Sequence, residues 1–237
     1  MATVTATVRR TAESDATRQA WADLREQGYA LVRDTDLGLD GSREHFGSRY
    51  FGGEVLEADH EAIHKDRDRA RDVIRYEWTD ARLSLAEHPT VTISNRGGYA
   101  GGRDHQRVEL LADPVAARWV EAALTLVSPE KRERLGTFGV NFFRTRTTVV
   151  SGPHRDGERY CLVYVVDKIG AGAQTRLHVA ADPDRIAFRR TLAPGDMLLF
   201  DDEAYLHDVT PLLDTPTSPC RRDAIVCTVN YPSTYEV

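Results

Sequence analysis

Two segments of the N-terminal half place apolar residues at helical spacing. In residues 14–34, SDATRQAWADLREQGYALVRD, the side chains of Ala20, Trp21 and Leu24 fall on one face, and a glycine then precedes the apolar run YALV. Residues 113–135 begin with an Asp-Pro pair suited to a first helical turn and continue with an apolar stripe. These patterns predict a helix followed by a short strand, and later a pair of helical elements.

The intervening chain is polar and lacks a clear period. Residues 40–75 are rich in charge, and the run HKDRDRARD at 64–72 mixes both signs, which favours a solvated helix face or a loop. Residues 94–107, SNRGGYAGGRDHQR, are glycine-rich but lack the spacing of a phosphate-binding loop. This second segment is either a mobile loop near a site or a plain connector.

The pattern changes after residue 135. Short runs rich in β-branched and aromatic residues, such as RYCLVYVVD and DAIVCTVNYP, alternate with turn signals at fairly regular intervals. This spacing is typical of a sandwich or barrel of antiparallel strands. We therefore predict an α+β protein with a mainly β core. It forms one domain, residues 1–237, with a helix-rich part at 1–135 and a barrel at 136–237.

Composition limits the classes of partner. Hydrophobic residues make up 41% of the 237 positions and charged residues 29%, as in soluble globular proteins. The net charge of −6 argues against non-specific binding to nucleic acid. There is no apolar run long enough to cross a membrane, and the first residues lack an apolar secretory segment. Three cysteines without metal-binding spacing favour reduced thiols. We expect a cytoplasmic protein that acts on a small molecule; the sequence does not predict its oligomeric state.

A candidate metal site lies in the barrel half. His154 and Asp156 are two residues apart after a Gly-Pro turn, so that both side chains can point to one side of an extended chain. His207 follows about fifty residues later, far enough for several strands to intervene. Two histidines and one carboxylate form the facial set that binds Fe(II) and leaves three coordination positions open.

An open metal face suits a co-substrate that chelates the metal. A keto acid uses two positions, leaves one for O2, and needs a cation for its far carboxylate. The segment CRRDAIVCTVNYP supplies Arg221 and Arg222, of which only one can point into the barrel. Arg222 is in phase with Ala224, Val226 and Thr228, so we predict that Arg222 binds the carboxylate.

These motifs resemble a known family. GPHRDG, GAQTRLHV, PGDMLLFDDEAYLHDVTPL and RRDAIVCTVNYP are together similar to the Fe(II)/2-oxoglutarate-dependent dioxygenases, and within them to the bacterial branch that includes the L-isoleucine hydroxylases. The likeness covers residues 136–235 well and the N-terminal half loosely. The segment GAGAQT departs from the branch, which has a Gly-Gly pair and an acidic residue there. The resemblance implies a double-stranded β-helix of the jelly-roll or cupin type, with N-terminal helices packed on it.

The resemblance also implies an activity. Fe(II), 2-oxoglutarate and O2 would hydroxylate an unactivated C–H bond of a small free L-amino acid or close derivative, with succinate and CO2 as co-products. The carboxylate at Asp156 disfavours halogenation. Several alternatives stay open: a natural-product or carrier-bound substrate, desaturation or ring closure, a nucleic-acid demethylase, and a non-catalytic β-barrel that binds a metal or ligand.

Residues for the substrate are harder to assign. Arg144, in NFFRTR, is a candidate cation for a substrate carboxylate, and Glu158 a candidate acid for its ammonium group. Tyr160 shares the alternating face of Glu158, and Arg107 lies beside the glycine-rich loop. The sequence does not fix the carbon attacked or the residues of any lid. Asp208 either orients the neighbouring imidazole or is an ordinary turn acid.

Overall fold

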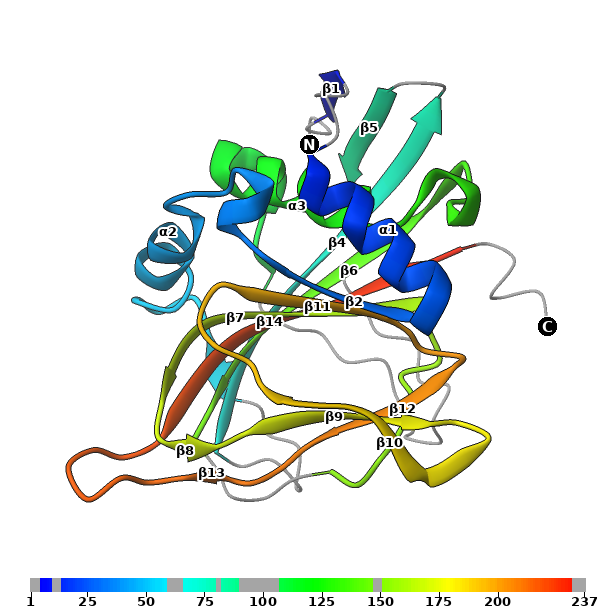
Figure 1. The fold of residues 1–237 in the computed structure, drawn as a ribbon. Coiled ribbons are helices and arrows are strands. Elements are labelled where there is room, and N and C mark those ends of the chain that lie inside the picture. The colour runs from blue at the N-terminus through cyan, green and yellow to red at the C-terminus, as the bar shows by residue number, and fades with distance from the viewer. Residues whose placement is uncertain are drawn as a thin grey trace.

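A computed structural model gives the fold (Figure 1). It describes the backbone of residues 5–9, and both backbone and side chains of residues 14–58, 66–79, 82–89, 107–146 and 151–231. His60 and His64 of the charge-rich segment and Tyr99 of the glycine-rich segment lie outside these ranges. Among the described residues, no helix is long and apolar enough to cross a membrane.

Three α-helices belong to the N-terminal half: α1 (Asp15–Gln27), α2 (Ser42–Arg49) and α3 (Pro114–Thr125). Short 3-10 helices span Thr35–Leu37, Leu110–Ala112 and Pro129–Lys131. Helix α1 is capped at both ends, since the side chain of Ser14 accepts a hydrogen bond from the Thr17 N–H and Gly28 ends the helix in the left-handed conformation.

Nine strands form the large sheet. Its order is β1-β5-β4-β6-β14-β7-β11-β2, with β3 paired to β4 at one side. The bounds are β1 Thr5–Arg9, β2 Tyr29–Arg33, β3 Glu57–Ala58, β4 Arg67–Thr79, β5 Arg82–Glu87, β6 Leu135–Thr145, β7 Tyr160–Ile169, β11 Asp196–Asp201 and β14 Arg221–Asn230.

Two small sheets complete the barrel. One has the order β10-β9-β12 and the other pairs β13 with β8. The bounds are β8 Ala171–Gly172, β9 Gln174–Val179, β10 Asp182–Thr191, β12 Tyr205–Val209 and β13 Leu212–Leu213. The antiparallel pairing and the stacked sheets confirm the predicted mainly β architecture.

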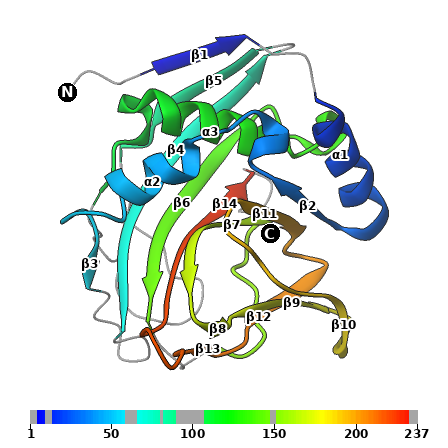
Figure 2. The same ribbon diagram turned by 60° about the vertical axis from the view of Figure 1, so that its left-hand side comes forward.

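The large sheet has two buried faces (Figure 2). Helices α1, α2 and α3 cover one, which we call the helix face; the small sheets lie opposite the other, the barrel face. The main apolar cluster fills the helix face and includes Trp119, Phe142 and Tyr164. A smaller cluster, including Val163 and Leu177, lines the barrel interior. Alternation along each strand therefore decides which side chains reach the barrel.

The charged run at 64–72 differs from the expectation of a helix face or loop. From Arg67 onward it forms β4, which pairs with β6 on one side and with β5 and β3 on the other. The physical reason is that the arginines recur at every second residue. This is the period at which side chains of a strand return to the same face, and it does not match the period of a helix. The helix-rich N-terminal part thus supplies β4, which lies next to β6 in the large sheet, and β5, which lies beyond β4.

Candidate active site

Three side chains from two segments converge at one end of the barrel. His154, Asp156 and His207 each place a ligand atom within 4.8 Å of the other two. Nε2 of His154 lies 3.8 Å from Oδ1 of Asp156, and Nε2 of His207 lies 3.8 Å from Oδ2 of the same carboxylate. Among the described residues this is the one group of histidine, cysteine or acidic side chains arranged to hold a metal ion.

Backbone pairing explains how the two histidines meet. His154 and His207 exchange reciprocal N–H···O=C hydrogen bonds of 3.1 and 2.8 Å, which makes them a directly opposed antiparallel pair. Their rings therefore project from the same side, with centroids 4.4 Å apart. Nδ1 of His154 lies 2.9 Å from the Gly152 carbonyl oxygen, so a proton on Nδ1 leaves Nε2 free for a metal.

The buried carboxylate of Asp202 lies next to both segments that carry the metal ligands. This carboxylate is 1% exposed and accepts hydrogen bonds from the backbone N–H groups of Gly157 and Glu158, at 2.8 and 3.1 Å. Its other oxygen lies 3.6 Å from Nδ1 of His207. One acid therefore holds the loop that carries Asp156 and lies beside the ring of His207, a role that no sequence motif indicated.

The electrostatics match this arrangement. Burial opposes the charged form of Asp202, but the adjacent imidazole and the backbone donors outweigh it and lower the pKa of the carboxyl. Burial likewise opposes a charged His207, yet Asp202 and Asp156 raise the pKa of its imidazole overall. Asp208 has a different role: on the opposite side of β12 it accepts hydrogen bonds from Arg176 and lies 3.4 Å from Nε2 of His178.

Arg222 lies on the barrel face of β14. It pairs with Thr145 and Lys168 and shares the barrel face with Ala224 and Val226. Its Nε and Nη2 atoms are buried and have no hydrogen-bond partner. Burial lowers the pKa of the guanidinium to about 10, which still leaves it charged at neutral pH. A buried cation of this kind requires an anion, because uncompensated burial of a charge is costly.

Thr175 is a second polar group of the barrel interior without a partner. The residue is 2% exposed, its hydroxyl oxygen has no hydrogen-bond partner, and it shares the inward side of β9 with the core residue Leu177. Like Arg222, it offers a buried donor that a carboxylate oxygen can satisfy. The chemistry of these residues therefore fits 2-oxoglutarate: the three ligands would hold the metal that its keto acid end chelates, and Arg222 would bind its far carboxylate.

Two substrate candidates lie on the helix face instead. Arg144 donates from Nε and Nη2 to both oxygens of Asp223, at 2.8 and 2.7 Å. Tyr160 is 1% exposed and packs edge-on against Tyr231. Alternation along β7 places Cys161, not Tyr160, on the barrel face, where its sulfur lies 3.6 Å from Oδ2 of Asp156. The structure therefore places neither candidate beside the metal ligands.

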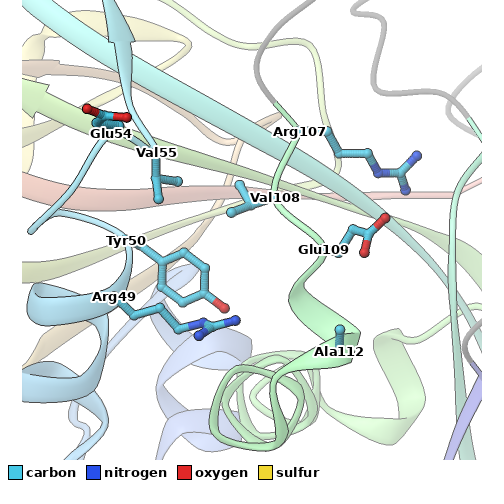
Figure 3. A pocket seen from close by; sticks show the side chains of 8 residues that line it. All are labelled: Arg49, Tyr50, Glu54, Val55, Arg107, Val108, Glu109 and Ala112. Carbon is cyan, nitrogen blue, oxygen red and sulfur yellow. The ribbon is translucent and has the colours of Figure 1, made fainter.

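Arg107 also lies away from the metal ligands. Its guanidinium contacts Glu87 at 3.2 Å and Asp72 at 3.4 Å, and Asp72 faces the helices. It lines a separate pocket near α2 and α3 (Figure 3), formed by Arg49, Tyr50, Glu54, Val55, Arg107, Val108, Glu109 and Ala112. Glu158 remains close to the site, because its backbone N–H binds Asp202. Arg155 turns away from the metal ligands and donates to the Glu203 carbonyl.

Comparison with known proteins assigns a family. Residues 54–228 match the family model described as 2OG-Fe dioxygenase. Sequence comparison with curated proteins found no match.

Comparison with solved structures shows the same fold in distant relatives. A bsmA homolog from Methylobium petroleophilum PM1 is 22% identical with a TM-score of 0.73, over 91% of this chain and 93% of that one. IDO from Bacillus thuringiensis is 16% identical with a TM-score of 0.69, over 91% and 99%. A prolyl-4-hydroxylase from Pseudomonas putida is 14% identical with a TM-score of 0.54, over 90% and 98%.

Proposed function

The chain belongs to the 2OG-Fe dioxygenase family, and we propose that it hydroxylates an unactivated C–H bond of a small free L-amino acid or a close derivative. The family implies Fe(II) and 2-oxoglutarate as cofactor and co-substrate. When bound, they supply the oxidising chemistry, with O2 consumed and 2-oxoglutarate converted to succinate and CO2.

The observation that supports this most directly is the joint placement of the metal ligands and Arg222. His154, Asp156 and His207 offer a facial set of ligands at one end of the barrel. Arg222 supplies a buried cation on the barrel face, and its Nε and Nη2 atoms have no hydrogen-bond partner. In this proposal the three ligands hold Fe(II), and Arg222 and Thr175 hold the far carboxylate of 2-oxoglutarate.

The amino-acid part of the proposal has separate support. The motifs around the metal ligands resemble the branch with L-isoleucine hydroxylases, and the solved neighbours include a prolyl-4-hydroxylase, whose name implies a prolyl substrate for that protein. In this chain Glu158 lies on the loop that carries Asp156, close to the metal ligands, and the proposal assigns its carboxylate to a substrate ammonium group.

The test combines binding and turnover. Anaerobic protein is titrated with Fe(II) and then 2-oxoglutarate, after which O2 and single L-amino acids are added and succinate is measured. We expect succinate formation stimulated by at least one amino acid, with a product heavier by one oxygen. A loss of two hydrogens instead would identify desaturation or ring closure.

The matched control compares two histidines. His207→Ala should abolish tight Fe(II) binding and lower turnover by about a thousandfold or more, because one of three ligands is lost. His178→Ala, on the outward side of the neighbouring strand β9, should retain both. Full activity in His207→Ala would disprove the metal assignment, whereas absence of amino-acid-stimulated succinate would disprove only the substrate class.

A further inference from the structure

The charge run of β4 is divided between the two faces of the large sheet. Asp68 and Asp72 alternate with the arginines of the same strand, and Asp72 faces the helices. The arginines take the barrel face, as shown by direct pairing with barrel-face residues of β6: Arg69 opposite Phe143 and Arg71 opposite Asn141. The strand thus presents positive charge to the interior of the barrel and negative charge away from it.

Arg69 and Arg71 are held as a pair. Nη2 of Arg69 and Nη1 of Arg71 each donate to Oδ1 of Asn141, both at 2.8 Å. Arg69 is only 9% exposed, and its guanidinium also lies over the ring of Phe143, with the carbon 5.0 Å from the ring centroid. Asn141 is in turn fixed by a 3.3 Å hydrogen bond to the Val226 carbonyl. The side-chain oxygen of Asn141 therefore brings the two guanidinium groups together.

The pair lies on the same face of the sheet as a row of residues that ends at the metal ligands. A row of directly paired barrel-face residues crosses the sheet from β4 to β7, and its last member, Cys161, touches Asp156: Val73, Gly139, Thr228 and Cys161. Arg71 belongs to the adjacent row and reaches over Gly139. A Cβ atom at Gly139 would lie 3.4 Å from Nη2 of Arg71 and 2.7 Å from Oγ1 of Thr228. The absence of a side chain at Gly139 allows Arg71 to extend toward the metal end.

We propose that Arg69 and Arg71 bind a carboxylate of the substrate, so that the substrate class is a small carboxylic acid held beside the metal by two guanidinium groups. Two converging guanidinium groups match the planar, two-oxygen geometry of a carboxylate. They take the role that the sequence pattern suggested for Arg144. The inference rests on the proposed function for its metal and co-substrate, but not for the identity of the acid.

The experiment measures binding, not turnover. Protein loaded anaerobically with Fe(II) and saturating 2-oxoglutarate is titrated by calorimetry with L-amino acids and with their carboxamides, which lack the negative charge. A second set contains aliphatic mono- and dicarboxylic acids with their amides, and phosphate monoesters. Arg71→Leu and Arg69→Leu are compared with Arg75→Leu, an exposed arginine of the same strand.

We expect wild-type protein and Arg75→Leu to prefer an acid over its amide by about a hundredfold, and Arg71→Leu and Arg69→Leu to lose this preference. Arg71→Lys should restore part of it. Affinity for 2-oxoglutarate should stay within about twofold in all variants. If only carboxylic acids that are not amino acids bind, with the preference lost in the variants, the inference holds while the proposed amino-acid substrate fails.

Other outcomes overturn the inference. These are equal binding of acids and amides by wild-type protein, an acid preference that survives in both leucine variants, binding confined to phosphate monoesters, binding by no probe in either set, or a loss of 2-oxoglutarate affinity in the leucine variants. The wild-type comparison of acid with amide keeps the test decisive even if a leucine variant fails to fold.

Discussion

Arg144 on β6 and Arg222 on β14 belong to adjacent residue pairs of the two strands, but their side chains lie on opposite faces of the sheet. On the helix face, Arg144 binds both oxygens of Asp223, its direct partner on β14. On the barrel face, the neighbouring Arg222 has buried Nε and Nη2 atoms without a partner. The charge of Arg144 is matched within the protein, whereas our proposal assigns the match for Arg222 to the co-substrate.

The same contrast extends to the acids. Asp72 and Asp223 face the helices and contact arginines there, and Asp208 binds Arg176 on the outward side of its strand. Asp156, beside the barrel interior, is instead one of three groups around a candidate metal position. For these residues, the face of the sheet separates the acids and arginines that pair within the protein from those that we assign to the active site.

The largest expected effect separates the two arginines directly. Arg222→Leu should raise the KM for 2-oxoglutarate by about a hundredfold, because the cation for its carboxylate is lost. It should not lower Tm, since it removes a buried charge without a partner. Arg144→Leu should show the reverse: an unchanged KM and a loss of about 3 kcal/mol in unfolding free energy, because Asp223 remains buried. Steady-state kinetics measure the KM, and urea unfolding measures the free energy of unfolding. If the two variants behaved alike, the assignment of Arg222 to the co-substrate and of Arg144 to stability would be wrong.

A second prediction compares two acids near β12, the strand that carries His207. Asp202→Asn should weaken Fe(II) binding about 10- to 100-fold, because it removes the charge that orients and polarises His207. Asp208→Asn, whose carboxylate binds Arg176 and His178 on the other side of β12, should leave Fe(II) affinity unchanged. Anaerobic Fe(II) titration decides, and equal losses in both variants would contradict the assignment.

A third prediction concerns the threonine hydroxyls. Thr175→Val should raise the KM for 2-oxoglutarate about tenfold and leave stability unchanged, since the hydroxyl has no partner within the protein. Thr210→Val removes an acceptor for the Gln174 N–H and should lower Tm with little change in KM. An unchanged KM in Thr175→Val would exclude this hydroxyl from the co-substrate site.

The smallest expected effect is a dependence of stability on pH from the helix face. Burial and the neighbouring Glu87 raise the pKa of Asp72 to about 8. The folded protein then retains a proton that the unfolded chain releases near pH 4, so stability should fall as pH rises from about 4 to 8. Thermal unfolding should show a Tm lower by a few degrees at pH 8.5 than at pH 6. Asp72→Asn should flatten this slope; a slope unchanged by the substitution would assign the effect elsewhere.

The sequence by itself determined the parts that depend on short spacing and residue type. Local chemistry predicts the turn that carries His154 and Asp156 and the alternation that directs Arg222 inward. It also predicts the succession of short strands after residue 135. The fold, the family and the candidate residues for the metal and the co-substrate could therefore be predicted from the order of the amino acids alone.

Only the tertiary structure decided which face each remaining charge occupies. Arg144 and Tyr160 lie on strands as expected, but the register of β6, β7 and β14 turns both toward the helices. The charges of β4 could not be assigned without its pairing with β6, and Asp202 meets His207 only because separate strands converge. In a sheet buried on both sides, a shift of one residue exchanges the two faces, so long-range pairing fixes what local sequence leaves open.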